Sequence, residues 1–213
     1  MATEKETYPA SFDIDYPEKL NRLSTFFRIL WSIPIVIILV LLSAGGSEIV
    51  INESSKEVST NGRDVTFGLF AVTALMIVFR HKYPRWWFNF ALELNRFMAR
   101  VGAYLFLLTD RYPSTTDEQS VHLNIDYPNV EQDLNRWLPL IKWLLVLPHI
   151  FVLLVLMIPA IGGTIVAWFA ILFTGRYPKN IFNYMVGLGR WGNRINAYAF
   201  LLTTDKYPPF SLK

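Results

Sequence analysis

Tyrosine is followed directly by proline at seven of the ten tyrosines in this chain. Proline fixes its own φ angle and pushes the preceding residue into an extended conformation, so each such pair interrupts or starts a helix. Tyrosine favours the headgroup layer of a bilayer, where its ring is buried and its hydroxyl stays hydrated. The Tyr-Pro pairs therefore predict helix boundaries at a membrane surface.

The same pattern occurs in both halves of the chain. Residues 14–17, Ile-Asp-Tyr-Pro, match residues 125–128, and residues 106–109, Phe-Leu-Leu-Thr, match residues 200–203. Basic-Tyr-Pro triplets also occur at matching places, at residues 82–84, 111–113, 176–178 and 206–208. A match of this length indicates a tandem duplication of one unit. The predicted copies are residues 1–113 and residues 114–213.

Composition places the chain among membrane proteins. It is 53% hydrophobic and 17% charged, with a mean hydropathy of +0.30, which is unusual for a soluble domain. Residues 26–44 and 143–161 are long enough to span a bilayer. Each is followed by a shorter apolar segment, residues 65–79 and 161–173, which predicts hairpins at 26–79 and 143–173. The expected turn of the second hairpin is Gly162-Gly163.

Charge predicts the orientation of these four spans. The acidic connection at residues 45–66 belongs in water, and basic residues gather at the other ends of the apolar segments. These are Arg22, Arg28, Arg80, Lys82, Arg85, Arg136, Lys142, Arg176 and Lys179. The positive-inside rule then places both termini in the cytoplasm. Two copies in the same orientation imply a pseudo-twofold axis along the membrane normal.

A third segment in each copy, residues 85–108 and 179–203, has one polar stripe on an otherwise apolar helix. The stripes consist of Asn89, Glu93, Arg96 and Arg100, and of Asn183, Gly187, Arg190 and Arg194. Such helices usually lie in the membrane interface. The stripe is either a solvated face with snorkelling arginines, a site for a lipid phosphate or an acidic partner, or an inward face against the hairpins. The site for a lipid phosphate or an acidic partner would use Asn89, Arg96, Arg100, Asn183, Arg190 and Arg194.

Short alternating segments precede each hairpin and predict strands. The alternating apolar residues are Phe12, Ile14 and Tyr16 in the first half, and Val121, Leu123, Ile125 and Tyr127 in the second. The two strands are expected to pair across the axis as a cytoplasmic ribbon. The predicted fold is therefore an all-α integral membrane protein with hairpins, interfacial helices and this short ribbon.

Residues suited to chemistry are few. The chain has no cysteine and three scattered histidines, so no metal site, cofactor site or acid/base pair is predicted. His149 lies next to Pro148 in an apolar span. Ionisable groups at membrane depth are candidates for function, and His149 is the candidate intramembrane polar site.

The Ile-Asp-Tyr-Pro starts, basic-Tyr-Pro joints and Phe-Leu-Leu-Thr ends resemble a bacterial integral membrane family, domain of unknown function 4389 (DUF4389). The resemblance extends over nearly the whole chain in two copies. It implies a multi-pass protein of the bacterial inner membrane. No activity, cofactor or catalytic residue comes with that family.

The expected function is that of a non-enzymatic four-span scaffold or an accessory subunit of a larger membrane complex. Expected partners are membrane lipids, anionic lipids among them, and other membrane subunits or a second copy, but no nucleic acid. One alternative is a small transporter or channel formed by oligomerisation. The other is a membrane-shaping protein whose hairpins enter and leave the bilayer from one side.

Overall fold

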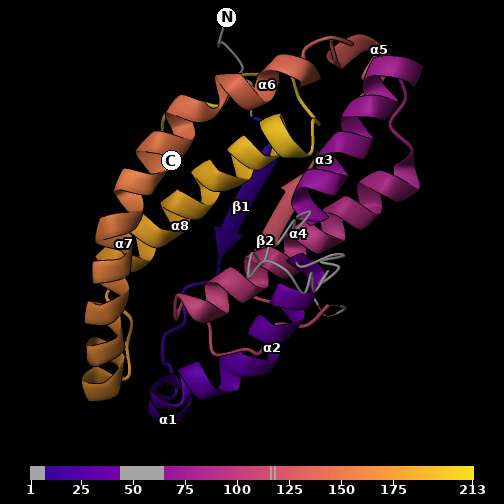
Figure 1. Ribbon diagram of the computed structural model, residues 1–213. Coiled ribbons are helices and arrows are strands. Elements are labelled where there is room, and N and C mark those ends of the chain that lie inside the picture. Colours follow the sequence, from indigo (N-terminus) through magenta and orange to yellow (C-terminus); the bar gives the residue numbers. More distant parts are fainter. Residues whose placement is uncertain (1–7, 44–64, 116, 118) are drawn as a thin grey trace, which may run out of the picture.

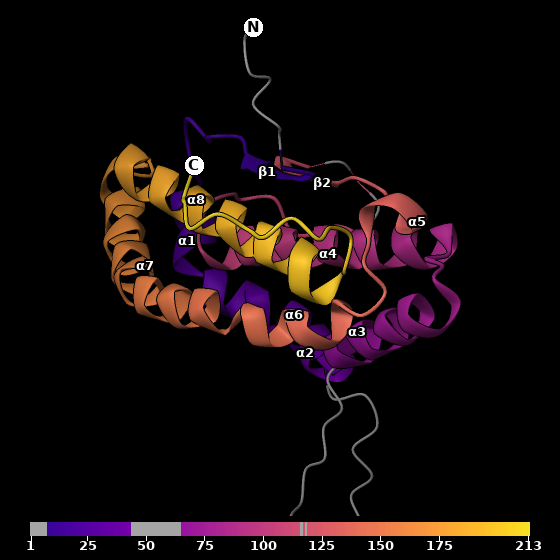
Figure 2. The same cartoon turned by 90° about the horizontal axis from the view of Figure 1, so that it is seen from above.

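The computed structural model describes residues 8–43, 65–115, 117 and 119–213. Figures 1 and 2 show three layers: a two-stranded ribbon, a middle layer of helices α4 and α8, and an outer layer of α2, α3, α6 and α7. The elements are β1 (Ala10–Ile14), α1 (Arg22–Phe26), α2 (Arg28–Ser43), α3 (Val65–Leu75), η1 (Met76–Arg80), α4 (Arg85–Leu105), β2 (Val121–Ile125), α5 (Val130–Asp133), α6 (Pro139–Leu145), α7 (Leu147–Thr174), α8 (Lys179–Ile195) and η2 (Asn196–Phe200).

The ribbon confirms the predicted pairing of the two strands. β1 and β2 are antiparallel, with Phe12 opposite Leu123 at the centre of the register. These two residues are also equivalent in the sequence repeat, since each lies two positions before the Ile of Ile-Asp-Tyr-Pro. A twofold axis therefore passes between them. The apolar residues of β2 are buried and the alternating His122 and Asn124 are exposed, as expected for a ribbon with one covered face.

Each strand packs mainly against the amphipathic helix of the other half of the chain. β1 lies against α8, and β2 lies against α4. The halves also meet at the helix ends, where the backbone N–H of Leu20 donates to the carbonyl of Gly175 at 2.9 Å. The indole N–H of Trp168 on α7 donates to the carbonyl of Thr25 at 3.2 Å. The two copies are thus interlocked rather than arranged as separate bodies.

Four Tyr-Pro pairs form the joints of this interlock. The hydroxyl of Tyr16 donates to the carbonyl of Tyr177 at 2.5 Å, and the hydroxyl of Tyr127 donates to the carbonyl of Tyr83. Tyr83 and Tyr177 are only 2% and 1% exposed. Burial raises the pKa of both phenols, which keeps them neutral. These two rings therefore lie inside the protein, although the sequence placed Tyr-Pro pairs at a membrane surface.

The prediction of four membrane spans is wrong. Of the residues that the structure describes, only Pro139–Thr174, formed by α6 and α7, is long and apolar enough to cross a membrane. The apolar helical stretches of the first half, Arg28–Leu39 and Gly68–Arg80, are shorter. The expected tip of the first hairpin lies outside the described residues. A two-stranded sheet is present beside the helices.

The second predicted hairpin at 143–173 is also wrong, because Gly162 and Gly163 lie inside the continuous helix α7. A glycine inside a helix costs about 1 kcal/mol relative to alanine. A long apolar helix tolerates this cost for two glycines when no turn-forming polar residue accompanies them. The helix instead ends at Gly175, whose φ of 72° suits the left-handed position after a helix. The sequence signal for a turn was therefore a weak one.

Close packing between β1 and α8 yields a first prediction. A Cβ atom added at Gly189 would lie 2.3 Å from Cε1 of Phe12, whereas one added at Gly192 would meet no atom within 4 Å. Gly189→Ala should therefore lower the free energy of unfolding by about 1–3 kcal/mol through overpacking. Gly192→Ala is the matched control and should leave stability unchanged or raise it. Thermal unfolding in detergent measures both, and equal effects would contradict this packing.

Candidate functional site

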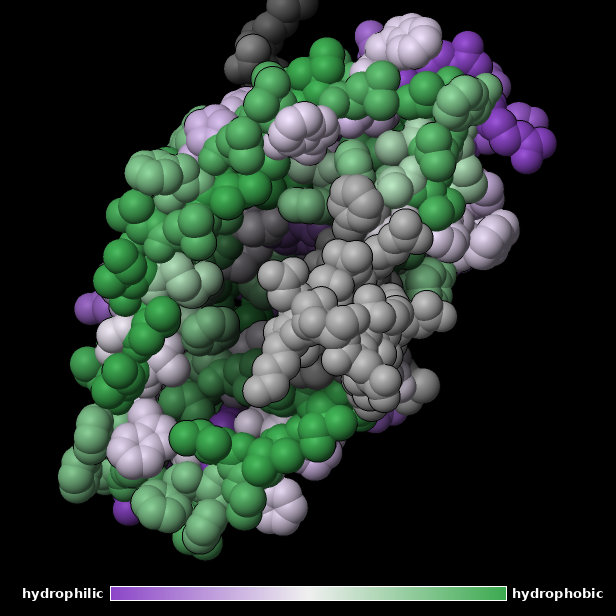
Figure 3. Space-filling view, viewed as in Figure 1, coloured by the Kyte–Doolittle hydropathy of each residue, from purple (hydrophilic) through white to green (hydrophobic). Residues whose placement is uncertain are grey.

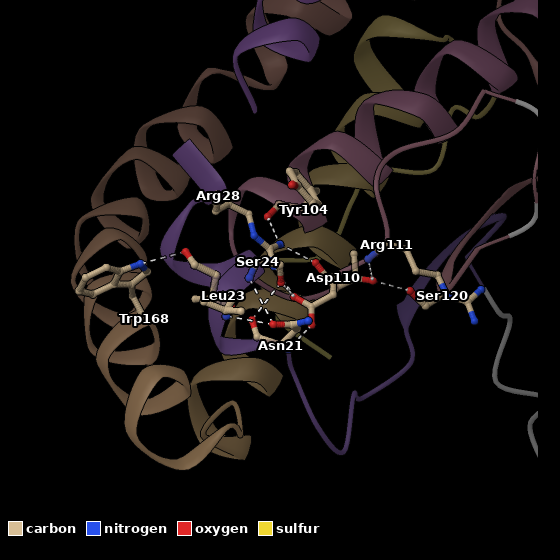
Figure 4. Close-up of polar contacts among 11 residues, drawn as sticks. Asn21, Leu23, Ser24, Arg28, Tyr104, Asp110, Arg111, Ser120 and Trp168 are labelled. Carbon is tan, nitrogen blue, oxygen red and sulfur yellow. Dashed lines mark hydrogen bonds and ion pairs between the residues drawn. The ribbon is translucent and has the colours of Figure 1, made fainter. Parts of the chain in front are cut away.

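A buried cation in each half of the chain is held by the loop that follows the amphipathic helix. In the first half, Arg28 is 4% exposed. Its Nη1 donates to the carbonyls of Tyr104 at 2.8 Å and Thr109 at 2.6 Å, and its Nη2 donates to Asp110 (Figure 4). The guanidinium carbon also lies 4.3 Å from the centre of the Tyr104 ring. These three hydrogen bonds, together with the charge pairing with Asp110, compensate the burial of Arg28.

The second half repeats this arrangement with lysine in place of arginine. Lys142 is fully buried, and its Nζ donates to the carbonyl of Thr204 at 2.7 Å. The same nitrogen lies 2.7 Å from Oδ1 of Asp205 and 4.9 Å from the centre of the Tyr198 ring. Lys142 occupies the position equivalent to Arg28 in the repeat. Each half therefore uses one cation, one aromatic ring and one aspartate.

Each aspartate also holds the backbone at the start of the apolar helices that precede it in the chain. Oδ2 of Asp110 accepts from the N–H of Asn21, and Oδ2 of Asp205 accepts from the N–H of Asn135, both at 2.5 Å. The Asn21 side chain caps α1 by accepting from the N–H of Leu23 at 2.9 Å. We call Asn21, Arg28 and Asp110 the first clamp, and Asn135, Lys142 and Asp205 the second clamp. Both clamps fix the outer layer to the middle layer.

Two arginines of the polar stripes, Arg96 and Arg190, face the ribbon. Nε of Arg96 donates to the carbonyl of Leu123 at 3.0 Å, and Nε of Arg190 donates to the carbonyl of Phe12 at 3.1 Å. Arg190 also pairs with Asp13 at 2.8 Å. The acceptors are the two central residues of the ribbon, so the two contacts are related by the same axis. These two contacts explain why both copies of the repeat have an arginine at this position.

The other four residues of the candidate anion site are two buried arginines and two exposed asparagines. Arg100 donates to the carbonyl of Ser114 at 2.9 Å, and Arg194 donates to the carbonyl of Lys213 at 2.7 Å. Burial lowers the pKa of Arg194. Asn89 and Asn183 are exposed near the starts of α4 and α8. The structure thus does not bring the six residues into one surface cluster, and their contact with anionic lipid or a partner stays a prediction.

His149 lies inside the protein, away from the outer surface of α7. It is fully buried, and its Nδ1 lies 3.1 Å from Nε1 of Trp191, whose N–H can only donate. The imidazole stacks on Phe210 with ring centres 3.7 Å apart. His149 therefore helps to hold the C-terminal segment against α7 and α8. A further role as an intramembrane polar site stays a prediction.

The outer layer carries many large apolar side chains that are exposed in the described part of the chain. On α7, Phe151 and Ile158 are 70% and 71% exposed, and on α2 Ile29 is 82% exposed. Figure 3 shows this face as a broad apolar surface over α2, α6 and α7. Soluble monomers rarely expose a continuous apolar patch larger than a few hundred Å². This face is therefore the strongest candidate for a functional surface in the described chain.

Sequence reasoning missed the clamps, although a signal for them existed. The charge pattern places Arg28 and Lys142 among the basic residues at the cytoplasmic ends of the apolar segments, but both are buried inside the protein. Asp110 and Asp205 occur at matching places in the repeat, directly before a basic-Tyr-Pro triplet. An acidic residue kept in both copies beside an apolar helix with one cation could have indicated an ion pair.

Comparison with known proteins gives one match. The model of the family described as Domain of unknown function (DUF4389) matches residues 137–211. This supports the family resemblance for one copy, in the second half, rather than for two tandem copies. No curated protein and no solved structure matches the chain.

The second clamp yields a prediction for stability. Asp205→Asn removes the negative charge that compensates the fully buried Lys142, and breaking a buried ion pair on one side costs about 3–5 kcal/mol. We expect a loss of that order in thermal or denaturant unfolding of the purified protein in detergent. Asp117→Asn is the control, because Asp117 is exposed and its carboxylate belongs to neither clamp. A similar small effect for both variants would show that the clamp does not stabilise the fold.

Proposed function

We propose that this protein is a non-enzymatic membrane scaffold or accessory subunit of the bacterial cytoplasmic membrane, with its outer helical layer in lipid. The observation that carries the proposal is the exposed apolar face of α2, α3, α6 and α7. Lipid or the apolar surface of a membrane partner would remove this face from water. The mean hydropathy of +0.30 agrees with such an environment.

The buried cations support a structural role over a reactive one. Arg28, Arg100, Lys142 and Arg194 all donate to backbone carbonyls of the chain itself. Their charges are therefore used to fix loops to helices. We infer that these buried hydrogen bonds and ion pairs of the described residues hold a rigid apolar surface, which is what a scaffold or an accessory subunit requires.

The positions of the charged pairs favour an outer layer that lies in the plane of one leaflet. α8 packs against α7 and runs beside it (Figure 1). If α7 stood upright across the bilayer, it would carry the pair Arg190–Asp13 on α8 and β1 towards the hydrocarbon core. Charged groups at that depth are costly unless they are enclosed, and the Arg190 and Asp13 side chains are 39% and 63% exposed. An α7 that lies flat leaves this pair in water.

The flat orientation also agrees with cytoplasmic termini. The Tyr8 hydroxyl donates to the carbonyl of Arg194 at 3.2 Å, and Arg194 donates to the carbonyl of Lys213. The two ends of the described chain therefore meet at α8, on the side of the ribbon (Figure 2). We propose that this side faces the cytoplasm, in keeping with the basic residues of the joints.

The flat orientation supports a second candidate function, membrane shaping. Helices that occupy one leaflet from one side widen that leaflet and favour curvature. The observation that favours this candidate is that the apolar helices lie together on one side of the molecule (Figure 2). Transport along the axis remains an alternative prediction without such an observation.

Assembly size tests the scaffold proposal. We expect the native protein, extracted in a mild detergent, to elute with other membrane proteins in a particle larger than a micelle with one 24.7 kDa chain. The double variant Leu154→Glu with Ile158→Glu changes two side chains that are 64% and 71% exposed on one face of α7, and it should release these partners. Gln132→Glu, exposed on α5, should not. A lone monomer from native membranes would contradict the proposal.

Cysteine labelling tests the flat orientation. The chain has no cysteine, and Gln132 and Asn180 are exposed residues near opposite ends of the α6–α7 stretch. With Gln132→Cys and Asn180→Cys made singly, an impermeant maleimide should label both from the same side of sealed vesicles. Labelling from opposite sides would mean that this stretch crosses the bilayer.

A further inference from the structure

The twofold axis that passes between the strands continues into a cavity of about 340 Å³. Phe12 and Leu123 of the ribbon line its floor, and α4 and α8 form its walls. Its volume falls within the range of about 300–1,000 Å³ that is usual for ligand sites. Among the described residues that line the cavity, none is charged. An ionised ligand would therefore find no partner for its charge.

The cavity is continuous with the apolar outer face. Leu153 and Met157 of α7 line it, and Met157 is also 37% exposed on the outside. Figure 3 shows the hollow beside α7 on this face. Met98 and Met185 line the walls further in, and methionine side chains adapt to flexible alkyl chains. A chain from the surrounding lipid would thus find an apolar path inwards.

Asn193 lines the cavity and carries an acceptor without a partner among the described residues. Asn193 is 6% exposed, and its Nδ2 donates to the carbonyl of Ser11 at 3.1 Å. This bond fixes the orientation of the amide, because the opposite orientation would place two oxygens together. Its Oδ1 is buried and has no hydrogen-bond partner among the described residues. An unsatisfied buried acceptor costs about 1–3 kcal/mol, and a ligand with a hydrogen-bond donor would recover this once a small shift of the cavity wall lets its hydroxyl reach Oδ1.

The asparagines that line the cavity do not occur at equivalent positions in both halves of the chain. The residue equivalent to Asn193 in the first half is Ala99, and the residue equivalent to Asn196 is Gly102. Asn196 donates to Asn95, whose own equivalent is Gly189. The cavity therefore departs from the twofold symmetry through its asparagines. These amides also bond within the fold, Asn193 to β1 and Asn196 to α4, and the acceptor that these bonds leave unused is Oδ1 of Asn193.

We propose that this cavity binds an uncharged single-chain amphiphile from the membrane, with a hydroxyl group at Asn193 Oδ1 and the alkyl chain directed along the methionines towards α7. Long-chain alcohols and monoacylglycerols have this chemistry. The inference rests on the proposed function only in that the ligand enters from lipid. It deepens that function by giving the scaffold a bound lipid at its axis.

Photolabelling of the full chain in lipid nanodiscs tests the site. The probe is a long-chain primary alcohol with a diazirine close to the hydroxyl end of the chain, and the labelled peptides are identified by mass spectrometry. Native protein should be labelled on residues that line the cavity. Monooleoylglycerol should compete, and methyl oleate, which lacks a donor, should compete about tenfold less well, since one hydrogen bond contributes up to about 1.5 kcal/mol.

Glycine variants supply matched controls for the site. Gly192 lines the cavity and Gly162 lies on the exposed side of α7, and a Cβ at either position meets nothing within 4 Å. Gly192→Leu should fill the cavity and abolish labelling there, whereas Gly162→Leu should leave it unchanged. Gly102→Leu fills the cavity from the opposite wall, and it replaces Gly192→Leu if thermal unfolding shows that variant to be misfolded.

Three results would overturn the proposal: labelling confined to the outer surface of α7, equal labelling of Gly192→Leu and native protein, or equal competition by methyl oleate. The test is separate from that of the proposed function. If carbonate washing removes the protein from membranes but its cavity is still labelled, the ligand site is supported and the scaffold proposal is contradicted.

Discussion

The pairing of a buried cation with a loop aspartate is the interaction on which the arrangement of the layers depends. Arg28 and Lys142 lie at the start of the apolar layer, where an unpaired charge would be costly. Asp110 and Asp205 compensate these charges and also accept from the backbone at the start of the same helices. One carboxylate thus neutralises a cation and fixes a helix start. The loop, the middle layer and the outer layer are positioned together.

The interlock of the two halves follows from where the ribbon lies. Each strand is covered by the helix of the other half, and the arginines Arg96 and Arg190 each donate to the ribbon at its centre. Because Tyr16 and Tyr127 join the halves at the helix joints as well, neither half contains a complete core. The repeat therefore folds as one body around its axis. Equivalent residues also differ at the axis, where the cavity lies.

Local features of the fold were predictable from the sequence, whereas the packing of its helices was not. Strand alternation around Phe12 and Leu123 predicted the ribbon, and polar stripes predicted helices that are present as α4 and α8. The Gly162-Gly163 pair did not form the expected turn, because glycine permits a turn without requiring one. The sequence places Arg28 and Lys142 among the basic residues at the cytoplasmic ends of the apolar segments, since local sequence cannot show that an aspartate more than sixty residues later will pair with them inside the protein. The apolar composition indicates a lipid environment, but it does not indicate whether a helix crosses the bilayer or lies in the plane of one leaflet.

The depth of α7 in lipid is the central physical claim of this account. Nitroxide labels on Leu154, Ile158, Ile161 and Ile165, which are exposed along α7, can report depth through their relative accessibility to oxygen and to a water-soluble nickel complex. A helix in the plane of one leaflet predicts nearly the same shallow depth at all four positions. A depth that increases steadily along the helix, or passes through a maximum at the bilayer centre, would contradict it.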